Sequence, residues 1–117
     1  MPETFIEFCI FQVKPDKVVE FETLLADVVK SQQEQVGVVD IKYSKREYHI
    51  DFEQIKQGLP PKKLTRIVKS VKYMLCWEFD TKENYGLAQK HMYETYDKRI
   101  SKCLIEPHTK YLGERIF

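Results

Sequence analysis

The fold of this chain is decided by its first hydrophobic stretch, Thr4-Phe-Ile-Glu-Phe-Cys-Ile-Phe-Gln-Val13. Side chains alternate between the two faces of a strand, so Cys9 and Phe11 share one face while Phe8 and Ile10 share the other. Both faces are apolar, and aromatic and β-branched residues favour strands. The pattern therefore predicts a strand that is covered on both sides.

Two amphipathic helices and three further strands are predicted after this strand. Pro15 and Asp16 are typical of the first turn of a helix, and Thr81 is a good N-cap for the second helix. Alternating apolar residues up to Phe79 indicate a strand just before Thr81. The predicted elements are a helix from Asp16 to about Gln35, a strand from Val38 to about His49, a strand from Val71 to Phe79, a helix from Thr81 that ends before Pro107, and a strand from His108 to Phe117.

The resulting order is β-α-β-β-α-β. This order predicts an α+β, ferredoxin-like fold, in which two helices cover one face of an antiparallel sheet. We expect residues 1–117 to form a single domain. Residues 51–66 contain one glycine and two adjacent prolines, so they are predicted to be a long exposed connection in a hairpin, with one or two helical turns at its start.

Composition excludes several classes of protein. The chain has 117 residues and 19 basic against 18 acidic side chains, a net charge of +1. A general nucleic-acid binder carries a larger basic excess, and no apolar run here is long enough to cross a membrane. Its three cysteines form no C-x-x-C pair, which indicates free thiols. We therefore expect a cytoplasmic protein with no nucleic-acid or membrane partner.

Two helices cover only one face of a sheet, which leaves one apolar face of the first strand in water. A patch of that kind usually marks an interface. The sequence therefore predicts a homodimer in which two copies pack sheet against sheet.

Three segments resemble the antibiotic-biosynthesis-monooxygenase-like (ABM) family. The turn Val13-Lys14-Pro15-Asp16-Lys17 is followed by Glu20-Phe21 and the pair Leu24-Leu25, as in the family's opening. The strand end Cys76-Trp77-Glu78-Phe79 is similar to an "E-x-W" motif, and Gln89-Lys90-His91-Met92 is similar to a helical "A-H" signature. Asp16 stands where the family usually has glycine, and residues 51–66 exceed its usual tight hairpin.

The resemblance implies a dimeric α+β barrel with a pocket between the helices and the sheet of each subunit. Members include monooxygenases that oxidise phenols or quinols with O₂ and without a cofactor, a branch that degrades haem, and many proteins with no demonstrated activity. The haem branch uses an asparagine on the first strand. Between Thr4 and Val13 this chain has none, and Glu7 and Gln12 are its only polar candidates there.

The candidate site is a cavity between the second helix and the sheet. His91 is the catalytic candidate, because the resemblance falls on it and because imidazole transfers protons near neutral pH. Trp77, Tyr73, Tyr43 and Met92 are the substrate-binding candidates. The alternative for His91 is a structural role at the border of the helix, and the alternative for the others is packing in the core.

No metal is expected, because neither Glu94 nor Asp97 forms a metal-binding pattern with His91. The predicted function is a cofactor-independent monooxygenase of an aromatic or quinol small molecule. The alternative is a non-enzymatic small-molecule-binding or interaction module on the same fold, and a haem-degrading monooxygenase is the third hypothesis.

Overall fold

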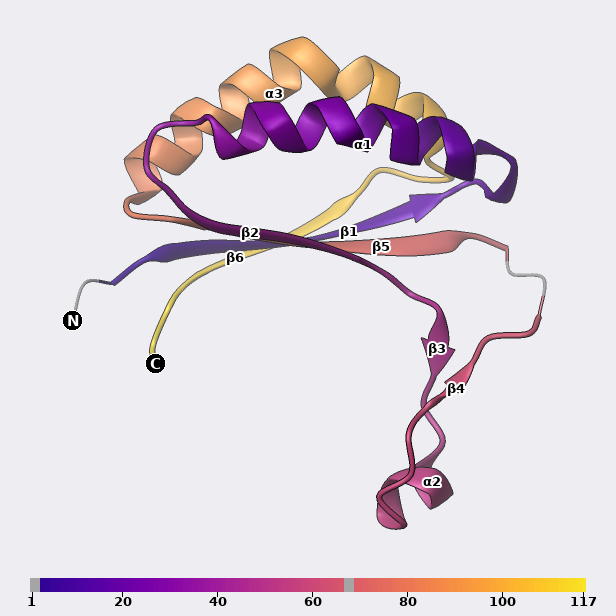
Figure 1. Cartoon of the computed structure of the whole chain (residues 1–117). Coiled ribbons are helices and arrows are strands. Elements are labelled where there is room, and N and C mark those ends of the chain that lie inside the picture. Colours follow the sequence, from indigo (N-terminus) through magenta and orange to yellow (C-terminus); the bar gives the residue numbers. More distant parts are fainter. Residues whose placement is uncertain (1–2, 67–68) are drawn as a thin grey trace.

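The computed structural model describes residues 3–66 and 69–117. Two long helices lie side by side on one face of a four-stranded sheet, and a narrow extension projects from the opposite side (Figure 1). In chain order the elements are β1 (Phe5–Val13), the 3₁₀ turn η1 (Pro15–Lys17), α1 (Val18–Gln33), β2 (Val38–Lys45), β3 (Tyr48–His49), α2 (Phe52–Lys56), β4 (Lys62–Lys63), β5 (Val71–Phe79), α3 (Lys82–Cys103) and β6 (Thr109–Glu114).

The predicted α+β, ferredoxin-like fold is confirmed. The sheet has the strand order β2-β5-β1-β6, and each neighbouring pair is antiparallel. The predicted N-cap of the second long helix is also present, because the side chain of Thr81 accepts a hydrogen bond from the backbone N–H of Asn84 at 3.1 Å.

Some boundaries differ from the prediction. Helix α1 ends at Gln33 rather than near Gln35, because the chain must turn at Gly37 to enter β2. The strand predicted to reach His49 leaves the sheet after Lys45, and Tyr48–His49 then pairs with Lys62–Lys63 as a separate two-stranded ladder.

The register decides which face of β1 the helices cover. Cys9, Phe11 and Val13 are buried on the helix side, together with Leu75 and its neighbours on β5. The core also includes Phe21 and Val28 of α1 and Tyr85, Ala88 and Met92 of α3. Trp77, which faces the same side, is fully buried and packs against Phe79 and Tyr85.

The other face of the sheet, which we call the open face, has no helix over it (Figure 1). Phe8 is 54% exposed there and Tyr111, directly opposite it on β6, is 62% exposed. The open face also carries Ile6, Ile10, Met74 and Cys76. β1 is therefore apolar toward the helices and toward solvent, as its sequence pattern predicts.

The narrow extension, residues 46–66, is called the arm below. It contains β3, α2 and β4, and the predicted helical turns are present as α2. Its base is joined to the sheet by a backbone bond from Arg46 N–H to the carbonyl of Lys72, 2.8 Å long. No helix in the described part of the chain combines the length and the apolar character that a bilayer-spanning segment needs.

Gly37 is required where α1 turns into β2. Its φ angle is +87°, and its carbonyl accepts a hydrogen bond from the N–H of Asp80 at 2.8 Å. A Cβ atom at this position would lie 2.2 Å from Oδ1 of Asp80. We predict that Gly37→Ala lowers the free energy of unfolding by about 1–3 kcal/mol, because it adds a left-handed backbone penalty and this clash.

Urea unfolding measures this change. The matched control is Gly86→Ala in α3, where a Cβ atom meets nothing and where alanine should raise the free energy of unfolding by up to about 1 kcal/mol. Equal effects of the two substitutions would contradict the role assigned to Gly37.

Candidate functional site

A cavity of about 130 Å³ lies between the two long helices and the sheet. Its exposed wall residues, Tyr93 and Lys110, come from α3 and β6, so the cavity opens between these two elements. The remaining lining residues are Phe11, Leu75 and Trp77 from the sheet, Val28 and Gln32 from α1, Tyr43 from β2, Gln89, Met92, Asp97 and Ile100 from α3, and His108 just before β6.

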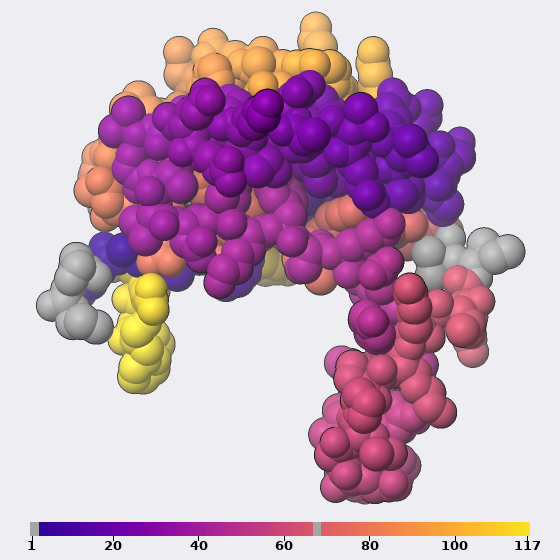
Figure 2. All heavy atoms as spheres, in the orientation of Figure 1, coloured from indigo at the N-terminus to yellow at the C-terminus, as the bar shows by residue number. Residues whose placement is uncertain are grey.

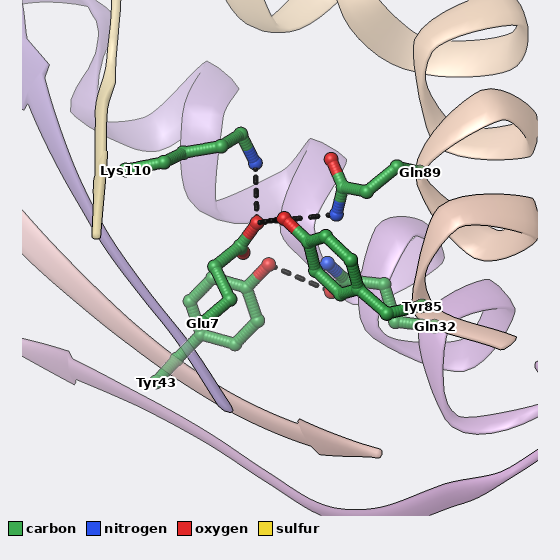
Figure 3. Close-up of polar contacts among 6 residues, drawn as sticks. All are labelled: Glu7, Gln32, Tyr43, Tyr85, Gln89 and Lys110. Atoms are coloured by element: carbon green, nitrogen blue, oxygen red, sulfur yellow. Dashed lines mark hydrogen bonds and ion pairs between the residues drawn. The ribbon is translucent and has the colours of Figure 1, made fainter. Parts of the chain in front are cut away.

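Glu7 is a fully buried carboxylate beside this cavity. Its Oε1 atom accepts three hydrogen bonds, from Tyr85 Oη at 2.6 Å, Gln89 Nε2 at 3.1 Å and Lys110 Nζ at 2.8 Å (Figure 3). The donors come from α3 and β6, so one oxygen joins three elements of the fold. A charge can be buried at this position because an ammonium group and two neutral donors surround it.

Two buried polar atoms of this region have no hydrogen-bond partner among the described residues, and both face the helix side. They are Oε2 of Glu7 and Nε1 of Trp77. The two residues lie directly opposite each other on β1 and β5. An unsatisfied buried donor or acceptor costs about 1–3 kcal/mol, so a neighbouring acceptor and donor without partners are groups that a bound molecule could complete.

A second polar pair lies next to the Glu7 cluster. Tyr43 Oη donates a hydrogen bond to Gln32 Oε1 at 2.7 Å, and Gln32 is buried although it lies on α1 (Figure 3). Burial raises the pKa of Tyr43 and of Tyr85, and the hydrogen bond to the Glu7 carboxylate adds to the rise for Tyr85. Both phenols therefore stay protonated at neutral pH and act as hydrogen-bond donors.

His108 is the histidine that lines the cavity. Its ring centroid lies 5.5 Å from that of Phe11, and Asp97 and Lys110 line the same cavity. Burial lowers the pKa of His108, and the positive charge of Lys110 lowers it further, against smaller opposing effects of Asp97 and Glu7. The imidazole is therefore neutral near pH 7 and can accept a proton.

Three of the predicted site residues, Trp77, Tyr43 and Met92, line the cavity. Tyr73 shares the strand face of Trp77, as its spacing implies, but lies at a separate groove beside α1. There its hydroxyl donates a hydrogen bond to Glu22, whose pKa is lowered by the bonds from Lys45 and from Tyr73 itself.

The structure does not place His91 in the cavity wall. His91 is exposed on α3, and its Nε2 atom lies 3.1 Å from Ser31 Oγ of α1. Successive residues of a helix are about 100° apart, and Tyr93, on the other side of Met92, lines the cavity, so His91 is turned away from the cavity and toward α1. This placement corrects the position predicted for His91 and fits its structural alternative.

Glu7, Lys110 and His108 are the site residues that the sequence analysis did not select. Glu7 shares the strand face of Cys9 and Phe11, which was a signal that it would be buried. In the predicted last strand, His108 and Lys110 are two residues apart, so their side chains share one face. Among residues 3–66 and 69–117, no group of three or more His, Cys, Asp or Glu side chains could hold a metal ion.

No family model matches the sequence, and no curated protein matches it. Solved structures do match. A putative antibiotic biosynthesis monooxygenase from Nitrosomonas europaea is similar with a TM-score of 0.70 and 11% identity, over 97% of this chain and 91% of that one. A mutant of SnoaB from Streptomyces nogalater, a cofactor-independent oxygenase, is similar with a TM-score of 0.67 and 14% identity, over 100% and 96%.

A monooxygenase from the gene ActVA-Orf6 of Streptomyces coelicolor, in complex with the ligand nanaomycin D, has a TM-score of 0.62 and 11% identity, over 97% of this chain and 88% of that one. Another similar structure is described as a protein of unknown function. The chain therefore has the ABM-like fold that its sequence motifs indicated. Identities this low establish the fold alone.

The neutral state of His108 predicts a pH dependence of stability. As the pH falls below about 6.5, His108 binds a proton in the unfolded chain before it does so in the folded chain. The free energy of unfolding must therefore fall as the pH decreases through this range. We predict that His108→Gln makes this fall less steep.

The measurement is urea unfolding at a series of pH values from neutral to mildly acidic. His49→Gln in the arm is the matched control, because it removes a histidine far from the cavity. If the His108→Gln curve runs parallel to that of the original chain, the assignment of a buried, neutral His108 is wrong.

Proposed function

We propose that the chain binds a small aromatic molecule that carries a hydroxyl group, and oxidises it with O₂ without a bound cofactor. One observation carries this proposal: the acceptor Glu7 Oε2 and the donor Trp77 Nε1 lack partners within the described residues. Trp77 lines the cavity, and Glu7, opposite it on β1, is hydrogen-bonded to the lining residues Gln89 and Lys110. A phenol complements them, since its hydroxyl can donate to Glu7 and a ring oxygen substituent can accept from Trp77.

The size of the cavity limits the ligand. An engineered cavity of about 150 Å³ holds one benzene molecule, and this cavity measures about 130 Å³. It therefore fits one aromatic ring, and a larger ligand would extend through the opening between α3 and β6. A tetrapyrrole has several rings of this size, so the volume argues against haem as the substrate.

In the proposed reaction the protein supplies no electrons to O₂. A phenol and O₂ give a quinone and water, so the substrate supplies all the electrons. The protein must orient the ring and remove the phenolic proton, after which the phenolate can transfer an electron to O₂. In this proposal Glu7 and Trp77 hold the substrate before reaction. The phenolic hydroxyl then turns from Glu7 to neutral His108, which accepts its proton in the place first assigned to His91.

Fluorescence of Trp77, the single tryptophan, tests ligand binding. We predict saturable quenching by hydroquinone or catechol. Glu7→Gln should weaken the affinity about 10- to 100-fold, because a hydrogen bond to a charged acceptor contributes about 1.5–3 kcal/mol. Glu78→Gln is the matched control, since Glu78 lies on the neighbouring strand and on the open face.

Oxygen uptake separates the two proposed classes of function. With phenol as the substrate, one O₂ consumed and one ¹⁸O atom from ¹⁸O₂ found in each quinone formed support the oxygenase, and His108→Gln should slow this reaction more than it weakens binding. Saturable quenching without oxygen uptake would leave the non-enzymatic binding module, and no quenching by either phenol would contradict both.

We also propose that two copies associate through their open faces. The support is the exposed apolar strip formed by Phe8, Tyr111, Met74 and their neighbours, since a contiguous strip on a sheet is typical of an interface. The helix side of the sheet is already covered, so association leaves the cavity in place.

Sedimentation equilibrium tests the dimer. At micromolar concentration the chain should show twice its own mass, and Phe8→Lys should shift it to the monomer, because burying an unpaired charge costs several kcal/mol, on the order of 3–5. The control is Val19→Lys, which replaces an exposed apolar residue of α1, away from the open face, and should leave the dimer unchanged. A chain that is monomeric throughout would rule out the dimer.

A further inference from the structure

The arm carries five large apolar side chains that the fold leaves uncovered. Each is at least half exposed, and α2 contains no buried residue. They are Tyr48, Ile50, Phe52, Ile55 and Leu59. Phe52 and Ile55 are three residues apart and therefore share one side of α2. A two-stranded ladder with one short helix is marginally stable by itself, so this cluster is suited to packing against something else.

The arm projects on the same side as the open face. In Figure 1 the helices lie on one side of the sheet, while the arm and the segment after β6 descend on the other. Figure 2 shows a hollow under the sheet between these two projections. Ile116 and Phe117 at the far end of the hollow are 83% and 89% exposed. The arm, the open face of the sheet and the C-terminal segment thus border one concave space.

The area of the open face indicates what fills this space. The strands of the sheet have nine, nine, eight and six residues, so at about 3.4 Å per residue and about 4.8 Å spacing the open face measures roughly 500 Å², and two such faces bury about 1,000 Å². Stable interfaces bury about 1,200–2,000 Å², so the sheets alone fall short of the lower limit. Aromatic side chains bury about 150–250 Å² each, and covering the arms of both copies would add several hundred Å².

We infer that the arm clasps a second copy of this chain, with Phe52 and Ile55 packed against the partner's surface. The inference rests on the dimer proposed above and extends it, because it assigns a partner to the segment that has no place in the subunit's own core. Sheets pack about 10 Å apart, so a projection on this side necessarily runs beside the second layer.

The arm contact is tested by the double substitution Phe52→Ser/Ile55→Ser in the full chain. Its matched control is Glu53→Ser/Lys56→Ser, which makes the same number of serines in the same helix and removes only an exposed ion pair. Sedimentation equilibrium should show the dissociation constant raised about tenfold or more for the apolar pair, and changed less than about twofold for the control.

A crosslinking experiment checks the same contact without depending on affinity. p-Benzoylphenylalanine in place of Ile55 should join two chains on irradiation, and a mixture of isotopically heavy and light chains should yield heavy–light products. The same group in place of Glu53 should give fewer of them. Crosslinks confined to single chains would overturn the inference.

The outcomes separate the arm from the dimer. One outcome is that the original chain is a dimer and Phe52→Ser/Ile55→Ser leaves its dissociation constant unchanged. That result would overturn the arm contact but keep the sheet-to-sheet dimer. If the original chain is a monomer, both are overturned. If it is a monomer that binds phosphatidylcholine–phosphatidylserine vesicles and loses this binding in Phe52→Ser/Ile55→Ser, the arm is a lipid contact and the inference is also overturned.

Discussion

The buried carboxylate of Glu7 is the constraint on which the arrangement of this molecule depends. It lies on the helix side of β1, where its neighbours are apolar, and a charge there is stable only with donors around it. Lys110 brings β6 to the edge of β1, while Tyr85 and Gln89 fix the rotation of α3 over the sheet. The same contacts leave a cavity between α3 and β6 instead of a closed core.

The two faces of β1 therefore differ in chemistry. On the helix side the strand supplies one charged acceptor among buried apolar residues, and on the other side it supplies Phe8 in an exposed strip. The cavity and the proposed dimer surface are therefore back to back on one strand. A substitution on the open face should reach the cavity only through the backbone, which makes the two proposals separately testable.

The fold could be predicted because its signals are local and repetitive. Strand alternation to Phe79, the N-cap Thr81 and the helical spacing of α3 each persist in the structure. The cavity was harder to predict, since its polar residues meet only in three dimensions. Lys110 lies 103 residues from Glu7, and its spacing gives no sign of the pairing. His91 was selected because the family motif falls on it and because imidazole transfers protons, but the motif does not show toward which side of α3 its side chain points.

Glu7 also explains why β1 adopts one register although both of its faces are apolar. A strand of that kind can slip by one residue with little loss of apolar burial, and such a slip exchanges its two faces. Here a slip would place Phe8 inside and Glu7 on the open face, away from the hydroxyl of Tyr85 and the ammonium of Lys110. The hydrogen bonds to one carboxylate thus distinguish two registers that hydrophobicity alone does not. The charge that is costly to bury is the group that specifies which face of β1 meets the helices and which face is left open.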